Sequence, residues 1–120
     1  MTKNCYFFSD GDLPSGFAIP AEFRDFVLAD ERPDVGSWWF LCDYPLHADF
    51  WIATLREQYP ERQLVPFAKM EDTDDVACFD GTDLSESPKV VYVHAFASPG
   101  WEVRGYAPDF SAWLAESMVQ

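Results

Sequence analysis

The sequence predicts an α+β fold, in which an antiparallel β-sheet of about four strands, connected as a meander, is flanked by helices. Four short apolar segments follow one another between residues 64 and 104 and are separated by tight turns. Segments with the apolar spacing of helices precede and follow them. The chain has 120 residues, of which 48% are hydrophobic and 18% aromatic. This length and composition predict a single domain, residues 1–120, with one packed core.

The N-terminal part of the chain predicts an extended segment followed by a helix. Residues 4–8 fit a short strand or an extended arm. A helix is expected to begin at Pro20, because proline suits the first helical turn and Glu22 then lies at the positive end of the helix dipole. Its apolar face has three- and four-residue spacing and consists of Phe23, Phe26 and Val27.

An aromatic run at residues 37–42 predicts a strand. Neighbouring strand residues face opposite sides, so one of Trp38 and Trp39 is expected in the core, while the other lies beneath a helix or exposed. A second helix is predicted from about residue 45 to residue 59, and Pro60 ends it. The apolar residues that keep helical spacing in it are Leu46, Phe50, Ala53 and Leu55.

The second half of the chain predicts the four strands of the meander. The expected strands are residues 64–70, 76–80, 88–96 and 101–104, with a turn at residues 98–100. Pro66 lies within the first of them and indicates an edge strand or a bulge, because proline cannot donate a ladder hydrogen bond. A final helix carries Phe110, Trp113, Leu114 and Met118 on its apolar face.

The charge of the chain narrows the class of partner. The formal net charge is −13, the pI is about 4.2, and residues 71–120 hold ten acidic but two basic residues. A negative field of this size disfavours nucleic acid and anionic membranes as direct ligands, and it steers a basic partner. The charge is equally compatible with an acidic protein that simply stays in solution.

The N-terminus and the cysteines predict a cytoplasmic protein. The first residues lack the pattern of a signal peptide, and the longest apolar run, residues 38–42, is too short to span a bilayer. Cys5, Cys42 and Cys78 are far apart, and no C-x-x-C pair indicates zinc. A reducing compartment fits them best, and no cofactor is expected.

None of the common catalytic motifs is present in the sequence. His47 is expected to be exposed at the start of the second helix. His94 lies in an alternating strand, in which Val91 and Val93 share one face. It could pair with a carboxylate across the sheet and act as a base in a small hydrolase. Without a nucleophile beside it, a structural or surface histidine is the favoured interpretation, and the chain is predicted not to be an enzyme.

Acidic residues are densest between residues 71 and 86, where no basic residue occurs. Three interpretations compete: solvated turns between strands, a Ca²⁺ or Mg²⁺ site, and a negative patch for a basic protein. The spacing does not match an EF-hand loop, which disfavours the metal site. Together with Trp101, an indole suited to an interface, the predicted partner-binding residues are Glu71, Asp72, Asp74, Asp75, Asp80, Asp83 and Glu86.

The second half of the chain resembles the SUKH superfamily, in particular its Smi/Knr-like branch. The resemblance covers residues 64–115 and starts with Pro66-Phe67-Ala68, an acidic turn and the strand at residues 74–80. It continues through valines and His94, Trp101-Glu102-Val103 and Tyr106, and ends in the helix at residues 110–114. The helix near Pro20 fits more loosely, and the Trp-rich segment 36–60 departs from the pattern.

The resemblance implies an α+β fold with an antiparallel sheet, and a role in protein binding without catalytic residues. Bacterial members are often immunity proteins that neutralise toxins, many of them nucleases, and fungal relatives regulate cell-wall assembly through protein contacts. The leading hypothesis is therefore a cytoplasmic immunity protein that binds a basic, nuclease-type toxin. The alternatives are a regulatory or scaffold module without a toxin partner and, less favoured, a small hydrolase that uses His94.

Overall fold

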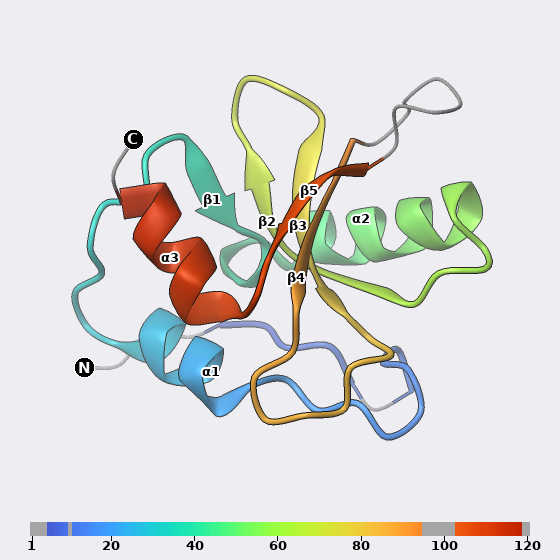
Figure 1. The fold of residues 1–120 in the computed structure, drawn as a ribbon. Coiled ribbons are helices and arrows are strands. Elements are labelled where there is room, and N and C mark those ends of the chain that lie inside the picture. The colour runs from blue at the N-terminus through green and yellow to red at the C-terminus, as the bar shows by residue number, and fades with distance from the viewer. Residues whose placement is uncertain (1–4, 10, 95–102, 119–120) are drawn as a thin grey trace.

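The computed structural model describes residues 5–9, 11–94 and 103–118, with only the backbone of residues 103 and 104 (Figure 1). The elements in this part of the chain are, in order, α1 (Ala21–Leu28), β1 (Trp38–Phe40), the 3₁₀ turn η1 (Leu41–Asp43), α2 (Pro45–Gln58), β2 (Leu64–Met70), β3 (Asp75–Asp80), β4 (Val90–His94), β5 (Val103–Ala107) and α3 (Phe110–Met118).

The strands form one antiparallel sheet in the order β1-β2-β3-β4-β5. The predicted α+β class and the meander are therefore confirmed, with one strand more than the four expected. The additional strand is β1, the aromatic run, which pairs with the end of β2 through Trp38 opposite Met70 and Phe40 opposite Ala68. Each strand lies beside its neighbour in sequence, and η1 and α2 form the long connection between β1 and β2.

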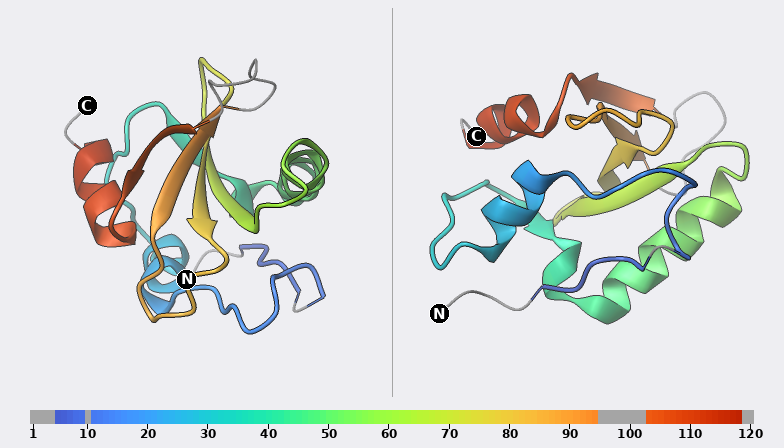
Figure 2. Two further views of the ribbon diagram at one scale, coloured as in Figure 1. Left: turned by 45° about the vertical axis from the view of Figure 1, so that its right-hand side comes forward. Right: turned by 90° about the horizontal axis from the view of Figure 1, so that it is seen from below.

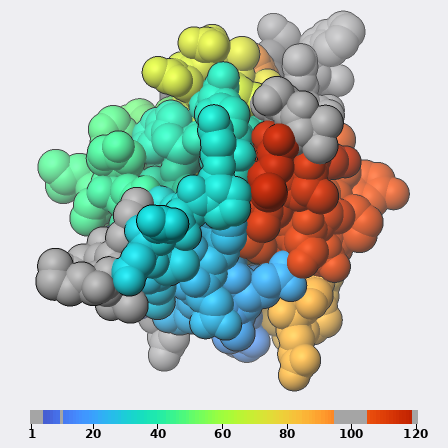
Figure 3. Space-filling view, turned by 90° about the vertical axis from the view of Figure 1, so that its left-hand side faces the viewer, coloured from blue at the N-terminus to red at the C-terminus, as the bar shows by residue number. Residues whose placement is uncertain are grey.

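Helices cover both faces of the sheet (Figure 2). Helices α1 and α3 lie on one face, where α3 buries its own Trp113 and Phe110, which are 0% and 2% exposed. On this side α3 lies next to α1 and the segment that follows α1 (Figure 3). Helix α2 covers the other face through Trp51 and Leu55. Burial on both faces explains why strands such as β3, with its four central residues buried, read as continuous apolar runs.

The core between the sheet and helices α1 and α3 is built from aromatic rings. The ring of Phe23 in α1 lies 5.5 Å from that of Phe79 and 5.4 Å from that of Phe110, both edge-to-face. Phe67 and Phe79 stack at 4.4 Å across β2 and β3. The predicted apolar face of the first helix is confirmed, because Phe23 and Val27 are buried and Phe26 packs against the same core.

The predicted apolar face of the second helix is wrong. The buried residues of α2 are Ala48, Trp51, Ile52 and Leu55, whereas Leu46 and Phe50 are 84% and 54% exposed. Residues 48, 51, 52 and 55 follow helical spacing more closely, and they point at β2 and β3. Of the face expected from the sequence, only Leu55 is buried.

The sequence indicated that Pro66 lies either on an edge strand or at a bulge. The structure confirms the bulge and not the edge strand. The register between β2 and β3 shifts between Pro66 and Ala68. Strand β2 is internal, since β1 pairs with residues 68–70 on its other side. Pro66 is tolerated because β1 does not extend to its position, so no ladder bond from its missing N–H is needed there.

Other boundaries differ by a few residues. The first aromatic strand ends at Phe40, and residues 41–42, expected as strand, belong to η1. No strand is assigned to residues 5–9, so this segment is the extended arm, held by the Tyr6 N–H that donates to the Cys42 carbonyl at 2.8 Å. In the described residues the last strand is Val103–Ala107, so it includes the expected residues 103–104 and continues to residue 107. The expected strand residues 101–102 lie outside the described residues. The expected turn at residues 98–100 lies outside the described residues.

Candidate functional site

The seven acidic residues predicted to bind a partner form two groups at opposite ends of β3 (Figure 1). Glu71, Asp72 and Asp74 lie between β2 and β3, and Asp75 is the first residue of β3; we call residues 71–75 the acidic turn. Asp80 is the last residue of β3, and Asp83 and Glu86 lie in the connection between β3 and β4. The structure thus does not bring all seven together in one patch, because a six-residue strand separates the groups by roughly 17 Å. Trp101 lies outside the described residues.

The carboxylates between β3 and β4 are engaged in local turns. Asp80 Oδ1 accepts hydrogen bonds from the N–H and the hydroxyl of Thr82, at 2.9 and 2.6 Å. Asp83 accepts from the N–H groups of Ser85 and Lys89, at 3.1 and 2.9 Å. The hydrogen bonds from the Ser85 side chain and from these two N–H groups lower the pKa of Asp83. These aspartates therefore stabilise the connection in the way that Asx turns do.

The acidic turn is built differently. Asp75 pairs with His94 and accepts a hydrogen bond from the Thr73 hydroxyl at 3.1 Å. Glu71, Asp72 and Asp74 are exposed. Lys69, near the end of β2, is only 8% exposed. Its ammonium donates to the Thr73 carbonyl and to the Met70 carbonyl, the latter at 2.8 Å. The ammonium group of Lys69 thus links the two sides of the turn through their carbonyls, while the carboxylates of Glu71, Asp72 and Asp74 remain exposed to solvent.

His94 has the cross-strand carboxylate that the sequence indicated. Its Nδ1 lies 3.0 Å from Asp75 Oδ1, and the two residues are direct partners in the register of β3 and β4. Val91 and Val93 point to the opposite face, against α2. The His94 carbonyl also accepts a hydrogen bond from the Tyr59 hydroxyl at 3.0 Å. These contacts fix the end of the sheet, which is what the favoured interpretation of a structural histidine expects.

An aromatic hollow adjoins the acidic turn. Its walls are Trp39, Tyr44 and His47, and its volume is about 340 Å³. Glu71 of the acidic turn also lines it. Trp38 packs in the core at 7% exposure, so Trp39, on the other side of the strand, is the one of the pair left half-buried, as predicted. His47 is exposed, which is also confirmed.

The sequence pattern missed the exposed apolar residues next to this hollow, because it assigned Leu46 and Phe50 of α2 to the core. The signal was present: Ala48, Trp51, Ile52 and Leu55 already complete a buried face, which leaves Leu46 and Phe50 on another side of the helix. Three large side chains in this short region, Tyr44, Leu46 and Phe50, are at least 50% exposed. Such grouping is typical of an interaction surface.

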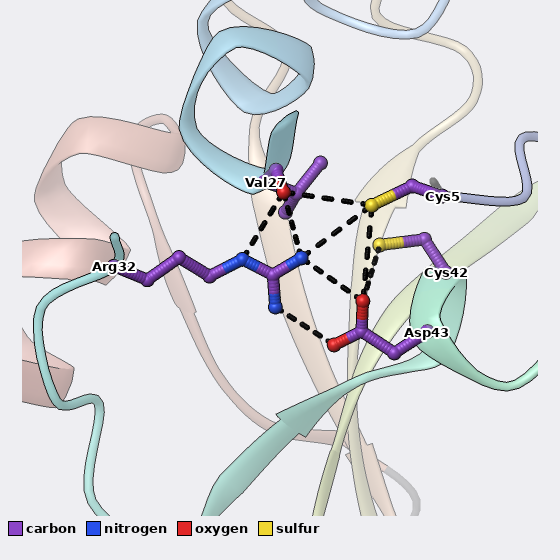
Figure 4. Close-up of polar contacts among 5 residues, drawn as sticks. All are labelled: Cys5, Val27, Arg32, Cys42 and Asp43. Atoms are coloured by element: carbon purple, nitrogen blue, oxygen red, sulfur yellow. Dashed lines mark hydrogen bonds and ion pairs between the residues drawn. The ribbon is translucent and has the colours of Figure 1, made fainter. Parts of the chain in front are cut away.

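A second polar cluster links the N-terminal arm, α1 and η1 (Figure 4). Arg32 donates to both carboxylate oxygens of Asp43, at 2.7 and 2.9 Å. It also donates to the carbonyl of Val27, at 3.1 Å from Nε and 2.7 Å from Nη2. That carbonyl lies in the last turn of α1, where no further helical N–H follows to bind it. Burial acts to lower the pKa of Arg32, but the hydrogen bonds and charge of Asp43 outweigh it and raise the pKa.

The same cluster contains potential metal ligands. In the part of the chain that the structure describes, the ligand atoms of Cys5, Cys42 and Asp43 lie within 4.8 Å of one another. The guanidinium of Arg32 engages both oxygens of Asp43 and lies 3.4 Å from the Cys5 sulfur. A cation here would meet this positive charge at close range, so the arrangement fits a structural ion pair better. Burial raises the pKa of the Cys42 thiol strongly, which also disfavours a thiolate ligand.

None of the helices in the described residues combines the length and apolar character needed to cross a bilayer. No curated protein and no solved structure matches the chain significantly. A protein-family model does: that of the SMI1 / KNR4 family (SUKH-1) matches residues 12–116. The match includes all five strands, α1 and α2, and α3 up to residue 116. It is consistent with an immunity-like protein-interaction domain and suggests a protein partner. From this match over most of its length, the chain belongs to the SMI1 / KNR4 family (SUKH-1).

Proposed function

We propose that this chain is an immunity protein that binds and neutralises a basic, nuclease-type toxin in the cytoplasm, without catalysis of its own. The observation that carries the proposal is the family match over residues 12–116. The family resemblance implies that binding a toxin is sufficient for protection. The three thiols fit the reducing interior of a cell, in which both the toxin and its inhibitor would meet.

Charge supports a basic partner. A nuclease must hold phosphates, and its groove therefore carries lysine and arginine. A protein with a net charge of −13 would approach such a groove faster than a neutral one, since complementary fields raise the association rate more than the affinity. An inhibitor that covers the groove would keep nucleic acid out of it.

Within this proposal the acidic turn is the principal contact and the β3–β4 connection a secondary one. The carboxylates of Glu71, Asp72 and Asp74 are exposed, whereas Asp80 and Asp83 already accept hydrogen bonds from their own turns. Forming a new contact through the latter would require these turn bonds to be shared or broken. Trp101 remains part of the proposed contact set.

The test is protection in a growing cell. The gene beside that of this chain is expected to encode a protein with a basic toxin domain. Expression of that domain alone should stop growth, and co-expression of this chain should restore it and yield a stable complex of the two purified proteins. A complex that forms without restoring growth would contradict neutralisation and favour a regulatory or scaffold module. Absence of both would contradict the proposed function.

A further inference from the structure

Three aromatic rings surround the hollow beside the acidic turn at nearly right angles to one another. The ring centroid of Trp39 lies 5.3 Å from that of Tyr44 and 5.4 Å from that of His47, with interplanar angles of 86° in both pairs. Tyr44 and His47 are 6.0 Å apart at 83°. At these separations the rings are in edge-to-face contact with one another, so a ligand would lie in the hollow that they line and not between the rings. Aromatic faces attract cations.

The hollow continues into a second one along α2. Leu46, His47, Phe50 and Trp51 line a depression of about 380 Å³, and His47 belongs to both hollows. We call the surface formed by Trp39, Tyr44, Leu46, His47 and Phe50 the aromatic face. Leu46 is 84% exposed and Phe50 54% exposed, so the apolar part of this face is in contact with water. Covering it would release that water and stabilise a complex.

The charges around the aromatic face indicate which kind of partner would bind there. Glu71 lines the first hollow, and neither hollow is lined by a lysine or an arginine in the part of the chain that the structure describes. The nearby ammonium of Lys69 is held by two carbonyls of the acidic turn. A second copy of this chain would bring another net charge of −13 to the surface, which opposes self-association. The complementary occupant is a cationic protein segment.

We propose that the aromatic face is the docking site for an arginine-bearing segment of the partner protein. The guanidinium stacks on the ring of Trp39 and meets that of Tyr44, which stands at 86° to it, edge-on, and Glu71 accepts its N–H groups. Arginine fits better than lysine because its planar fork both stacks on rings and binds a carboxylate in two places. Leu46 and Phe50 pack against apolar residues that flank the arginine in the partner's segment. This inference rests on the proposed function for the identity of the partner, but not for the chemistry of the site.

The first experiment uses a probe that needs no toxin. A capped peptide with two arginines separated by glycine is titrated into the isotope-labelled chain, and the amide and indole NMR signals are followed. We expect shifts at Trp39, Tyr44 and Glu71 that saturate at roughly millimolar peptide, and no shift at Trp113, which is 0% exposed. The control peptide carries citrulline, which keeps the shape and loses the charge. Equal shifts with citrulline, shifts centred on residues 80–86, or no shifts would overturn the proposal.

The second experiment uses matched variants in the complex with the toxin domain. Tyr44→Ala and Glu71→Gln lie at the aromatic face, and Tyr106→Ala and Glu61→Gln make the same changes at exposed positions outside the proposed contact set, where Tyr106 is 63% exposed on β5 and Glu61 lies in the turn after α2. Tyr44→Ala is expected to weaken binding about 30-fold, as buried aromatic anchors do, and Glu71→Gln about tenfold. The two control variants should bind within about twofold of the parent chain.

The two experiments separate the failure of the site from that of the function. A toxin domain that binds all variants equally would contradict the docking site and leave the immunity function standing. Arginine-dependent shifts at the aromatic face, in a chain that neither binds nor protects against the toxin domain, would contradict the function and leave the docking site standing. All of the changed side chains are at least half exposed, or are carboxylates in turns, so the variants are expected to fold.

Discussion

Replacing Phe79 by alanine should lower the free energy of unfolding by about 4 kcal/mol, because the change leaves a large cavity in a tightly packed core. Phe79 is 0% exposed, and its ring stacks on Phe67 at 4.4 Å and meets Phe23 at 5.5 Å. The loss comes from the ring contacts as well as from the apolar area, since the neighbouring strands hold the backbone and limit collapse. Denaturation by urea, followed by circular dichroism, measures it.

The matched control is Phe50→Ala, which removes an equally large ring from the surface of α2. Phe50 is 54% exposed, so this change should alter the free energy of unfolding by no more than about 0.5 kcal/mol. If Phe79→Ala prevents folding, Phe79→Leu should still fold with a loss of about 1.5 kcal/mol. Equal effects of Phe79→Ala and Phe50→Ala would show that the core is not where the structure places it.

Replacing Arg32 by alanine should lower the free energy of unfolding by about 3 kcal/mol, because it leaves the partly buried carboxylate of Asp43 without its cation. The side chains of Arg32 and Asp43 are 11% and 27% exposed, so water replaces only part of the lost interaction. The carbonyl of Val27 loses two donors at the same time. Thermal and chemical unfolding both report the change.

Arg32→Lys separates charge from geometry. A lysine ammonium cannot donate in parallel to both oxygens of Asp43 and to Val27, so this variant should recover only a minor part of the loss. Arg56→Ala is the control: Arg56 is exposed and donates to the backbone carbonyl of Asp12, and its removal should change stability by about 0.5 kcal/mol or less. Full recovery by lysine would contradict the role given to the forked geometry.

The sequence predicted those parts of the fold that depend on local patterns. The meander follows from short apolar runs between turns, and the start of α1 follows from Pro20, because such signals lie within a few residues of the element they specify. The buried face of α2 could not be chosen reliably, since two sides of this helix carry apolar residues. Tertiary packing against Leu64 and Val76 decides between them.

The candidate site was predicted less well than the fold, for the same reason. Density of acidic residues along the chain suggested one patch, but β3 runs through the middle of it and carries its two halves to opposite ends of the sheet. Likewise, Cys5 and Cys42 are 37 positions apart in sequence numbering, and only the path of the N-terminal arm brings them beside Asp43. The sequence did predict that His94 could pair with a carboxylate across the sheet, because the alternation of residues in its strand placed the histidine opposite Val91 and Val93. It did not identify Asp75 as that carboxylate.

In the function that we propose, this chain acts by presenting a negatively charged surface to a basic protein. The most direct measurement is the association rate of the chain with the toxin domain at several salt concentrations, determined by stopped-flow mixing with a label on the toxin. We expect the rate to fall at least tenfold between about 50 and 500 mM salt, and to fall further when the exposed Asp72 and Asp74 are both replaced by lysine. A rate that ignores both changes would contradict this proposal.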